Sequence, residues 1–151
     1  MKKLLFICSG NIYRSAFSEF FLNKKGGNAI CKSAGTNLFY PSPHPILIEI
    51  SRNEFNIDMS NHVPTEVNLE LAQWADIIIC FKREHYDHVI NTFDFKNKTF
   101  LIDNLVDIDD KSVFDDIDFL KLSNDAQSVV LLKKRLIEMG EILNKLWKKF
   151  Q

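Results

Sequence analysis

The sequence predicts an α/β fold of three layers, in which a central parallel sheet of four strands is covered by helices on both faces. Short apolar runs of strand length alternate with segments of helical spacing, which is the pattern of parallel strands joined by crossover helices. With 151 residues, the chain is long enough to bury a sizeable core. No repeat, low-complexity tract or linker divides it, so we expect one domain over residues 1–151.

Four apolar runs have the length of buried strands, at residues 4–7, around 29–31, at 77–81 and at 99–102. The first run follows two lysines, as at the start of a lipoprotein signal, but it is too short for the apolar part of a signal peptide. Ile7 also stands where a small residue should precede cleavage. We therefore interpret this run as the first strand. No other stretch approaches the length of a membrane-spanning helix.

Four helices are expected between and after these strands, over residues 15–23, 45–55, 65–74 and 84–91. Gly26 and Gly27 form a stop signal after the first of them. Pro45 lies in the first turn of the second, where proline is favoured. Thr65 is the expected N-cap of the third.

The C-terminal segment predicts one long amphipathic helix. Asn124 and Gln127 resemble a capping box at its start. Apolar residues then recur every three or four positions, at Val129, Leu132, Leu136, Met139, Leu143, Leu146 and Phe150. We expect this stripe to dock on the sheet of its own domain rather than on a membrane or a partner.

Composition excludes several classes of protein. The formal net charge of -1 argues against a general nucleic-acid binder, although a local basic pocket remains compatible with it. The three cysteines, Cys8, Cys31 and Cys80, have no paired spacing, which favours a reducing compartment over a disulfide framework. We therefore expect a cytoplasmic protein that does not insert into membranes.

Two polar clusters are not expected to bind metal. Residues 103–118 contain seven aspartates and predict an exposed loop, but Lys111 occupies the third ligand position of a calcium loop. His85, Asp87 and His88 lie close together in the fourth helix. The polar surface of a helix explains these three residues more simply than a metal site.

The stretch CSGNIYRS, Cys8–Ser15, lies between the first strand and the first helix. Backbone N–H groups that curl around the end of a parallel strand, together with a helix N-terminus, make a nest for an anion such as phosphate. Gly10 and Asn11 tolerate the backbone angles that such a turn requires.

Cys8 and Arg14 are the reactive residues of this turn. The helix N-terminus and the guanidinium would favour a thiolate at Cys8, and the planar fork of Arg14 can hold two phosphoryl oxygens. The stretch thus predicts phosphoryl transfer to sulfur. The spacing alone also fits a structural cysteine followed by a surface arginine.

Four ordered segments resemble the low-molecular-weight protein tyrosine phosphatase family. They are Cys-x-Gly-Asn-x-x-Arg-Ser at residues 8–15, SAGT at 33–36, IDMSNH at 57–62 and ADIIICF at 75–81. The resemblance implies a cysteine-dependent protein-tyrosine-phosphatase that needs no metal or cofactor. Its partner would be a phosphotyrosine-containing protein, with a tyrosine kinase as one candidate. No oligomeric state is implied.

The resemblance also implies roles for individual residues. Cys8 would be the nucleophile and Arg14 the clamp on the phosphoryl group. The phosphate-binding loop would comprise Ser9, Gly10, Asn11, Ile12, Tyr13, Arg14 and Ser15. The residues that support it would be Asn11, Ser33 and His62, and the substrate wall would be formed by Phe39 and Tyr40. Ser15 would stabilise the thiolate, although a helix cap is its simpler role.

Two departures from the family pattern affect these expectations. The family's general acid is an aspartate followed by proline, and this chain has no Asp-Pro. Asp110 in VDIDDKS and Asp115 in SVFDDID compete for the role, and Asp115 requires the smaller insertion before the last helix. Tyr13 stands where many members have a second cysteine, which leaves Cys8 more open to overoxidation.

Alternative functions follow from the same residues. A phosphate-binding pseudophosphatase would explain the missing Asp-Pro. A protein-arginine phosphatase shares the fold, but Ile12 in place of threonine resembles the tyrosine-directed branch. An arsenate reductase would need two further cysteines after the third strand, where the chain has only Cys80. A phosphocysteine carrier would typically lack an arginine placed like Arg14.

Overall fold

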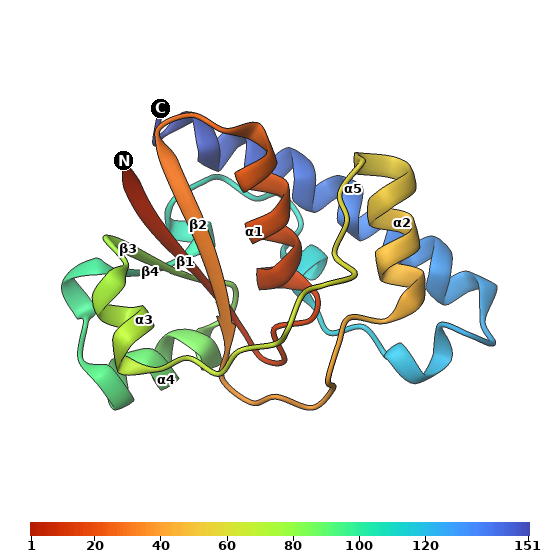
Figure 1. Ribbon diagram of the computed structural model, residues 1–151, viewed down its shortest axis with the longest axis horizontal. Helices are drawn as coiled ribbons and strands as arrows, with labels where there is room; N and C mark the ends of the chain where they lie inside the picture. The colour runs from red at the N-terminus through yellow and green to blue at the C-terminus, as the bar shows by residue number, and fades with distance from the viewer.

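The computed structural model describes all residues, 1–151, and contains one parallel sheet of four strands. The strands are arranged in the order β2-β1-β3-β4 (Figure 1). Their bounds are β1 (Lys2–Cys8), β2 (Ala29–Gly35), β3 (Ile77–Cys80) and β4 (Thr99–Leu101). The predicted four-stranded α/β architecture is confirmed, and β1 and β2 extend beyond the apolar runs that predicted them.

Helices cover both faces of the sheet. One face carries α1 (Arg14–Lys25), α2 (Pro45–Phe55) and α5 (Ala126–Lys148), and the other carries α3 (Leu69–Trp74) and α4 (Arg83–Phe93) (Figure 1). Four short 3-10 turns complete the chain, namely η1 (Lys96–Lys98), η2 (Ile102–Asn104), η3 (Lys111–Phe114) and η4 (Phe119–Lys121).

Alternate residues of the central strand β1 contribute to the two hydrophobic cores, one on each face of the sheet. Leu4, Phe6 and Cys8 join the core beneath α1, α2 and α5, whereas Leu5 and Ile7 join the core beneath α3 and α4. This alternation follows from the two-residue period of a strand. Because both faces are covered, residues 4–8 of β1 are apolar without interruption, and this run was visible in the sequence.

The amphipathic stripe of α5 docks on the domain itself, as expected. Leu132, Leu136, Met139, Leu143 and Leu146 are all buried in the same core as β1. None of the helices combines the length and the apolar character needed to cross a membrane.

Two helix starts differ from the prediction. The N-cap of α3 is Asn68, whose side chain accepts from the N–H of Leu71, and Thr65 lies outside the helix. The reason is that residues 65–67 are extended and pair with Gly35 at the end of β2, so the helix can begin only after them. In α5, Asp125 rather than Asn124 caps the helix, accepting from the N–H of Gln127.

The register of the sheet brings the carboxyl ends of β1 and β2 together. Cys8 lies opposite Gly35, so residues 9–13 pass directly over the end of β2. A Cβ atom on Gly35 would collide with the carbonyl oxygen of Ser9 and would lie 3.0 Å from the Asn11 nitrogen. Glycine in the SAGT segment therefore makes room for the loop after β1.

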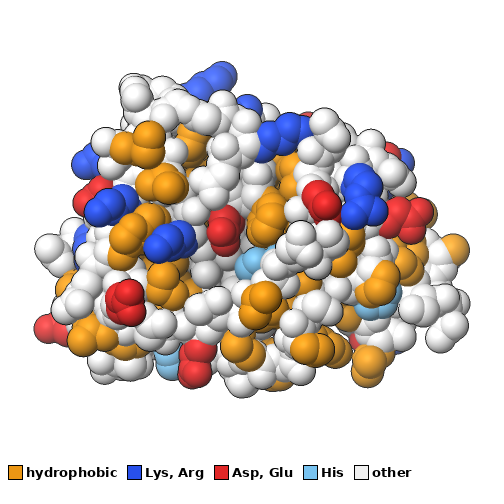
Figure 2. Space-filling model, viewed as in Figure 1, with side chains coloured by type: hydrophobic (Ala, Val, Ile, Leu, Met, Phe, Trp, Pro, Cys, Tyr) orange, Lys and Arg blue, Asp and Glu red, His pale blue; other side chains and the backbone are white.

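The surface mixes charges of both signs. Figure 2 shows acidic, basic and apolar side chains interspersed over one face of the molecule. The aspartate-rich segment contributes local contacts, because Asp103 pairs with Lys111 and Asp118 caps η4. It is only partly the exposed loop that was expected, since Val113 and Phe114 are buried within it.

Candidate active site

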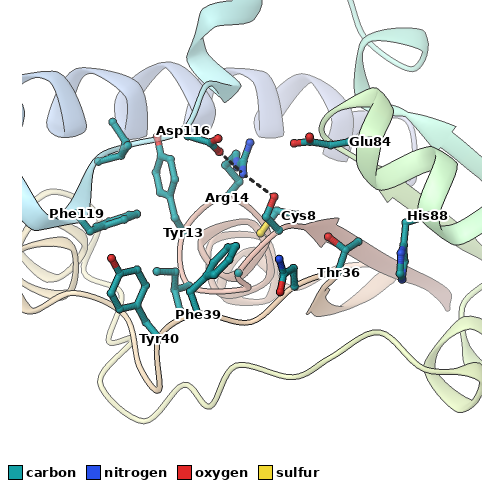
Figure 3. A pocket seen from close by; sticks show the side chains of 15 residues that line it. Cys8, Tyr13, Arg14, Thr36, Phe39, Tyr40, Glu84, His88, Asp116 and Phe119 are labelled. Carbon is teal, nitrogen blue, oxygen red and sulfur yellow. Dashed lines mark hydrogen bonds and ion pairs between the residues drawn. The ribbon is translucent and has the colours of Figure 1, made fainter.

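The loop after β1 forms the floor of a pocket of about 570 Å³ at the carboxyl end of the sheet. Figure 3 shows Cys8 and Arg14 at its centre, with aromatic side chains on one side. The lining residues are Cys8, Ser9, Gly10, Ile12, Tyr13, Arg14, Thr36, Asn37, Phe39, Tyr40, Glu84, His88, Asp116, Ile117 and Phe119. A site at this edge of the sheet is the usual ligand position in open α/β folds.

Asn11 holds the loop in its curled shape. Its backbone is left-handed, with φ of 54°, a conformation that asparagine tolerates better than most residues. The side-chain amide nitrogen donates to the hydroxyls of Ser15 and Ser33, both at 2.9 Å. The amide oxygen accepts from the N–H of Thr65 at 2.9 Å. One buried side chain thus joins the loop to β2 and to the segment before α3.

The hydroxyl of Ser15 lies 2.8 Å from the sulfur of Cys8. Because Asn11 already donates to the Ser15 oxygen, the hydroxyl hydrogen is free to point elsewhere. Its nearest acceptor is the Cys8 sulfur, since the Ala34 carbonyl lies farther away, at 3.4 Å. A hydrogen bond donated to sulfur stabilises a thiolate more than a thiol. Ser15 therefore favours the reactive form of Cys8.

Two further residues support the loop from below. His62 Nε2 donates to the Asn11 carbonyl oxygen at 2.7 Å. Ser33 donates to Glu19, a carboxyl group on α1 whose pKa is raised by burial. Sequence analysis did not identify Glu19. Its position four residues after Ser15 on the same helix, and therefore on the same face, is the signal that could have found it.

Arg14 is buried, with 4% of its surface exposed, and its guanidinium has an unfilled donor. Nη1 donates to the Phe114 carbonyl oxygen at 2.7 Å, and Nη2 bonds Asp116 at 2.9 Å. Nε is buried and has no hydrogen-bond partner. A buried cationic donor without a partner is costly, and a phosphoryl oxygen in the pocket would supply one.

Comparison with known proteins agrees with this geometry. Residues 3–146 match the family described as low molecular weight phosphotyrosine protein phosphatase. The chain belongs to this family.

Individual relatives lie at moderate sequence distance within the family. The chain is similar to the low molecular weight protein-tyrosine-phosphatase Ptp of Acinetobacter johnsonii, with 31% identity over 66% of this chain and 70% of the relative. A phosphatase structure of the family from T. tengcongensis has a TM-score of 0.83 at 24% identity, covering 99% of each chain. The YwlE arginine phosphatase from Geobacillus stearothermophilus has a TM-score of 0.79 at 22% identity, covering 99% of this chain and 92% of that one.

The structure places Asp116, rather than either aspartate considered from the sequence, in the family's pocket. Asp115 faces Lys82 at 2.9 Å, and this hydrogen bond lowers the pKa of its carboxyl group. Asp110 caps η3, and its bond with Ser112 lowers its pKa as well. Neither residue lines the pocket that holds Cys8. Asp116 is the second residue of the DD pair that begins with Asp115, and the side chains of successive residues point in different directions.

Aromatic rings form one side of the pocket. Phe39 and Tyr40 both line it, at the positions where the sequence suggested a substrate wall. Phe119, which sequence analysis did not consider, lies on the same side and packs edge-on against Tyr40, with the ring centroids 6.4 Å apart. The Tyr13 ring packs edge-on against Phe119 at 5.9 Å. The pocket therefore offers an apolar, aromatic approach to the phosphate-binding floor (Figure 3).

His85 is completely buried, so it does not belong to the polar helix surface that the sequence suggested. Its Nδ1 accepts from the N–H of Lys82 at 3.1 Å, so Nε2 carries the proton and donates to the Ser9 hydroxyl at 2.9 Å. His88 of the same cluster lines the pocket, and Asp87 pairs with Arg83. Burial and the nearby charge of Arg14 lower the pKa of His85 to about 3.

The free energy of unfolding is expected to decrease as the pH is lowered, because His85 stays neutral in the folded chain. Below pH 6.5 the unfolded chain protonates this histidine, while the folded chain resists protonation down to about pH 3. The free energy of unfolding should decline by up to about 1.4 kcal/mol per pH unit as pH drops through this window. Urea unfolding between pH 6.5 and 4.5 measures the slope. His85→Gln should flatten it, and an unchanged slope would contradict the prediction.

Proposed function

We propose that the chain hydrolyses phosphotyrosine in proteins through a phosphocysteine intermediate on Cys8. The observation that carries the proposal is the pairing of two groups in one pocket. The Cys8 sulfur receives a hydroxyl hydrogen from Ser15, and Arg14 presents a buried Nε–H without a partner. Membership of a cysteine-dependent phosphatase family supports the same chemistry.

The first step transfers the phosphoryl group to sulfur. The Cys8 thiolate attacks phosphorus, an S–P bond forms, and the bond from phosphorus to the tyrosine oxygen breaks. The loop N–H groups and the Arg14 fork stabilise the charge on the equatorial oxygens. Asp116 protonates the departing tyrosine oxygen, because its carboxyl group is the aspartate that lines the pocket.

The second step hydrolyses the phosphocysteine. Water attacks phosphorus, the S–P bond breaks, and Cys8 leaves as a thiolate. Asp116, now ionised, accepts the proton of the attacking water, so one carboxyl group acts as acid and then as base. Residues of the chain itself supply the nucleophile, the clamp on the phosphoryl group and the acid–base group, so these two steps route nothing through a metal ion or cofactor.

Substrate choice rests on the aromatic side of the pocket. Phe39, Tyr40 and Phe119 line the approach to Cys8, and a phenol ring packed against them would bury apolar surface. A phosphoserine side chain would be too short to use these rings. The expected partner is thus a phosphotyrosine-containing protein, with a tyrosine kinase among the candidates.

Two alternatives lose support. A pseudophosphatase was suggested by the missing Asp-Pro, but Asp116 supplies a carboxyl group in the pocket without the proline. An arsenate reductase needs a thiol relay. Cys80 is buried in the core on the opposite face of the sheet from Cys8, and Cys31 is buried too.

The oxidation state of Cys8 bears on where the protein works. A thiolate nucleophile functions only while reduced, and all three cysteines are free. This supports the proposal of a reducing compartment such as the cytoplasm.

The deciding experiment is turnover of matched phosphotyrosine, phosphoserine and phosphoarginine peptides in the presence of a chelator. We expect phosphotyrosine to be hydrolysed at least about 10-fold faster than the other two, since the rings contribute a few kcal/mol only to an aromatic substrate. Faster hydrolysis of phosphoarginine would contradict the proposed phosphotyrosine substrate, but it would still support phosphatase activity. Phosphate binding without turnover of any ester would favour the pseudophosphatase.

A further inference from the structure

Asp116 lies in a stretch without helix or strand, between η3 and η4. Its side chain is 78% exposed, and its one hydrogen-bond partner is Nη2 of Arg14. The next residue is Ile117, which leaves the backbone freer than a proline would. A phosphoryl group in the pocket would engage the same guanidinium. Some other contact must therefore hold Asp116 at the leaving oxygen during the reaction.

The ends of the stretch are fixed by aromatic packing. Phe114 is buried, and its ring centroid lies 5.1 Å from that of Phe81. Phe119 packs against Tyr13 on the other side, at 5.9 Å. These two anchors limit the path of residues 115–118, but neither contacts Asp116 itself.

The middle of the stretch is held by an arginine from α5. Nη1 of Arg135 donates to the carbonyl oxygen of Asp115 at 3.1 Å and to that of Asp116 at 3.3 Å. Arg14 holds the preceding carbonyl, that of Phe114. Arg135 sits between Leu132 and Leu136, which are buried in the core, so its backbone belongs to a rigid part of the fold.

We propose that Arg135 is a positioning residue that holds the backbone of Asp116 so that its carboxyl group reaches the leaving-group oxygen. This inference rests on the proposed function, in which Asp116 is the general acid. Arg135 does not line the pocket that holds Cys8. It fixes two successive carbonyls, and with them the direction in which the Asp116 side chain leaves the backbone.

The test compares leaving groups. Arg135→Met removes the donors and keeps an unbranched apolar stem. A misplaced acid harms only esters whose leaving group needs a proton. We expect kcat/KM on phenyl phosphate to fall about 10-fold, and on 2,4-dinitrophenyl phosphate by less than about 2-fold. Lys134→Met, which removes an exposed cation next to Arg135, should change neither value.

Other outcomes overturn the proposal. Equal losses on both esters would show a general disturbance, and no loss on phenyl phosphate would show that Arg135 is dispensable. Amide hydrogen exchange of residues 115–118 gives a readout that needs no turnover. It should accelerate in Arg135→Met and not in Lys134→Met. If the wild-type protein hydrolyses no ester, the proposed function fails by itself, and unchanged exchange would then reject the role of Arg135.

Discussion

Cys8→Ser is expected to reduce hydrolysis of para-nitrophenyl phosphate below detection while the pocket still binds phosphate or vanadate. A serine hydroxyl is far less acidic than a thiol, so the variant lacks an anionic nucleophile. The anion-binding parts remain, because Arg14 and the loop N–H groups belong to other residues. The Ser15 hydroxyl also keeps an acceptor at position 8.

The measurements are steady-state turnover and calorimetric titration with phosphate. Cys80→Ala is the matched control, since Cys80 is equally buried but lies in the core on the other face of the sheet. It should lose some stability and keep its turnover. Residual turnover in Cys8→Ser near the wild-type rate would remove the nucleophile from the proposed mechanism.

Asp116→Asn is expected to slow hydrolysis of phenyl phosphate by about 10²–10⁴-fold, the usual contribution of a general acid. Asparagine keeps the size of the side chain and a hydrogen bond to Arg14, but it has no proton to give to the leaving oxygen. Turnover of 2,4-dinitrophenyl phosphate, whose leaving group needs little protonation, should be much less affected.

Asp115→Asn and Asp110→Asn are the matched controls. The Asp115→Asn variant loses a half-exposed ion pair with Lys82, and the Asp110→Asn variant loses part of the η3 cap. Both variants should therefore retain most of the activity. A large loss in Asp115→Asn together with normal turnover in Asp116→Asn would return the acid role to the residue that the sequence preferred.

Local signals accounted for most of the fold. The first strand was visible because both of its faces are buried, which makes Leu4, Leu5, Phe6 and Ile7 continuously apolar. The start of α2 was predicted because Pro45 marks its first turn, and the structure shows that the helix ends at Asn56, which is left-handed at φ of 53°. In both cases the residues that decide the structure are neighbours in the chain.

The residues of the pocket floor could be predicted from the sequence because they, too, are neighbours in the chain. Cys8, Asn11 and Arg14 fall within one turn, and the strand-to-helix context assigns their directions. The structure brings Ser33 and His62 to this turn, at the positions that the family resemblance suggested. Their own sequence neighbourhoods carry no sign of that contact.

The parts that sequence reasoning missed depend on contacts between distant segments. Thr65 could not be excluded as a cap without knowing that residues 65–67 pair with Gly35 at the end of β2. His85 looked like a surface residue until the sheet placed Ser9 against its ring. The different positions of Asp115 and Asp116 depend on Lys82 and Arg14, their respective partners, which lie more than 30 residues away along the chain.

The phosphate floor is assembled from segments spread over the whole sequence. Asn11 links the first loop to β2 and to Thr65, and Arg14 reaches forward to Phe114. An unfolded or half-folded chain therefore has no place for the anion. Inorganic phosphate, the reaction product, should accordingly act as a mass-action stabiliser of the native state, adding about 2.7 kcal/mol at a hundredfold excess over its dissociation constant. The protein would then gain resistance to unfolding wherever its own product accumulates.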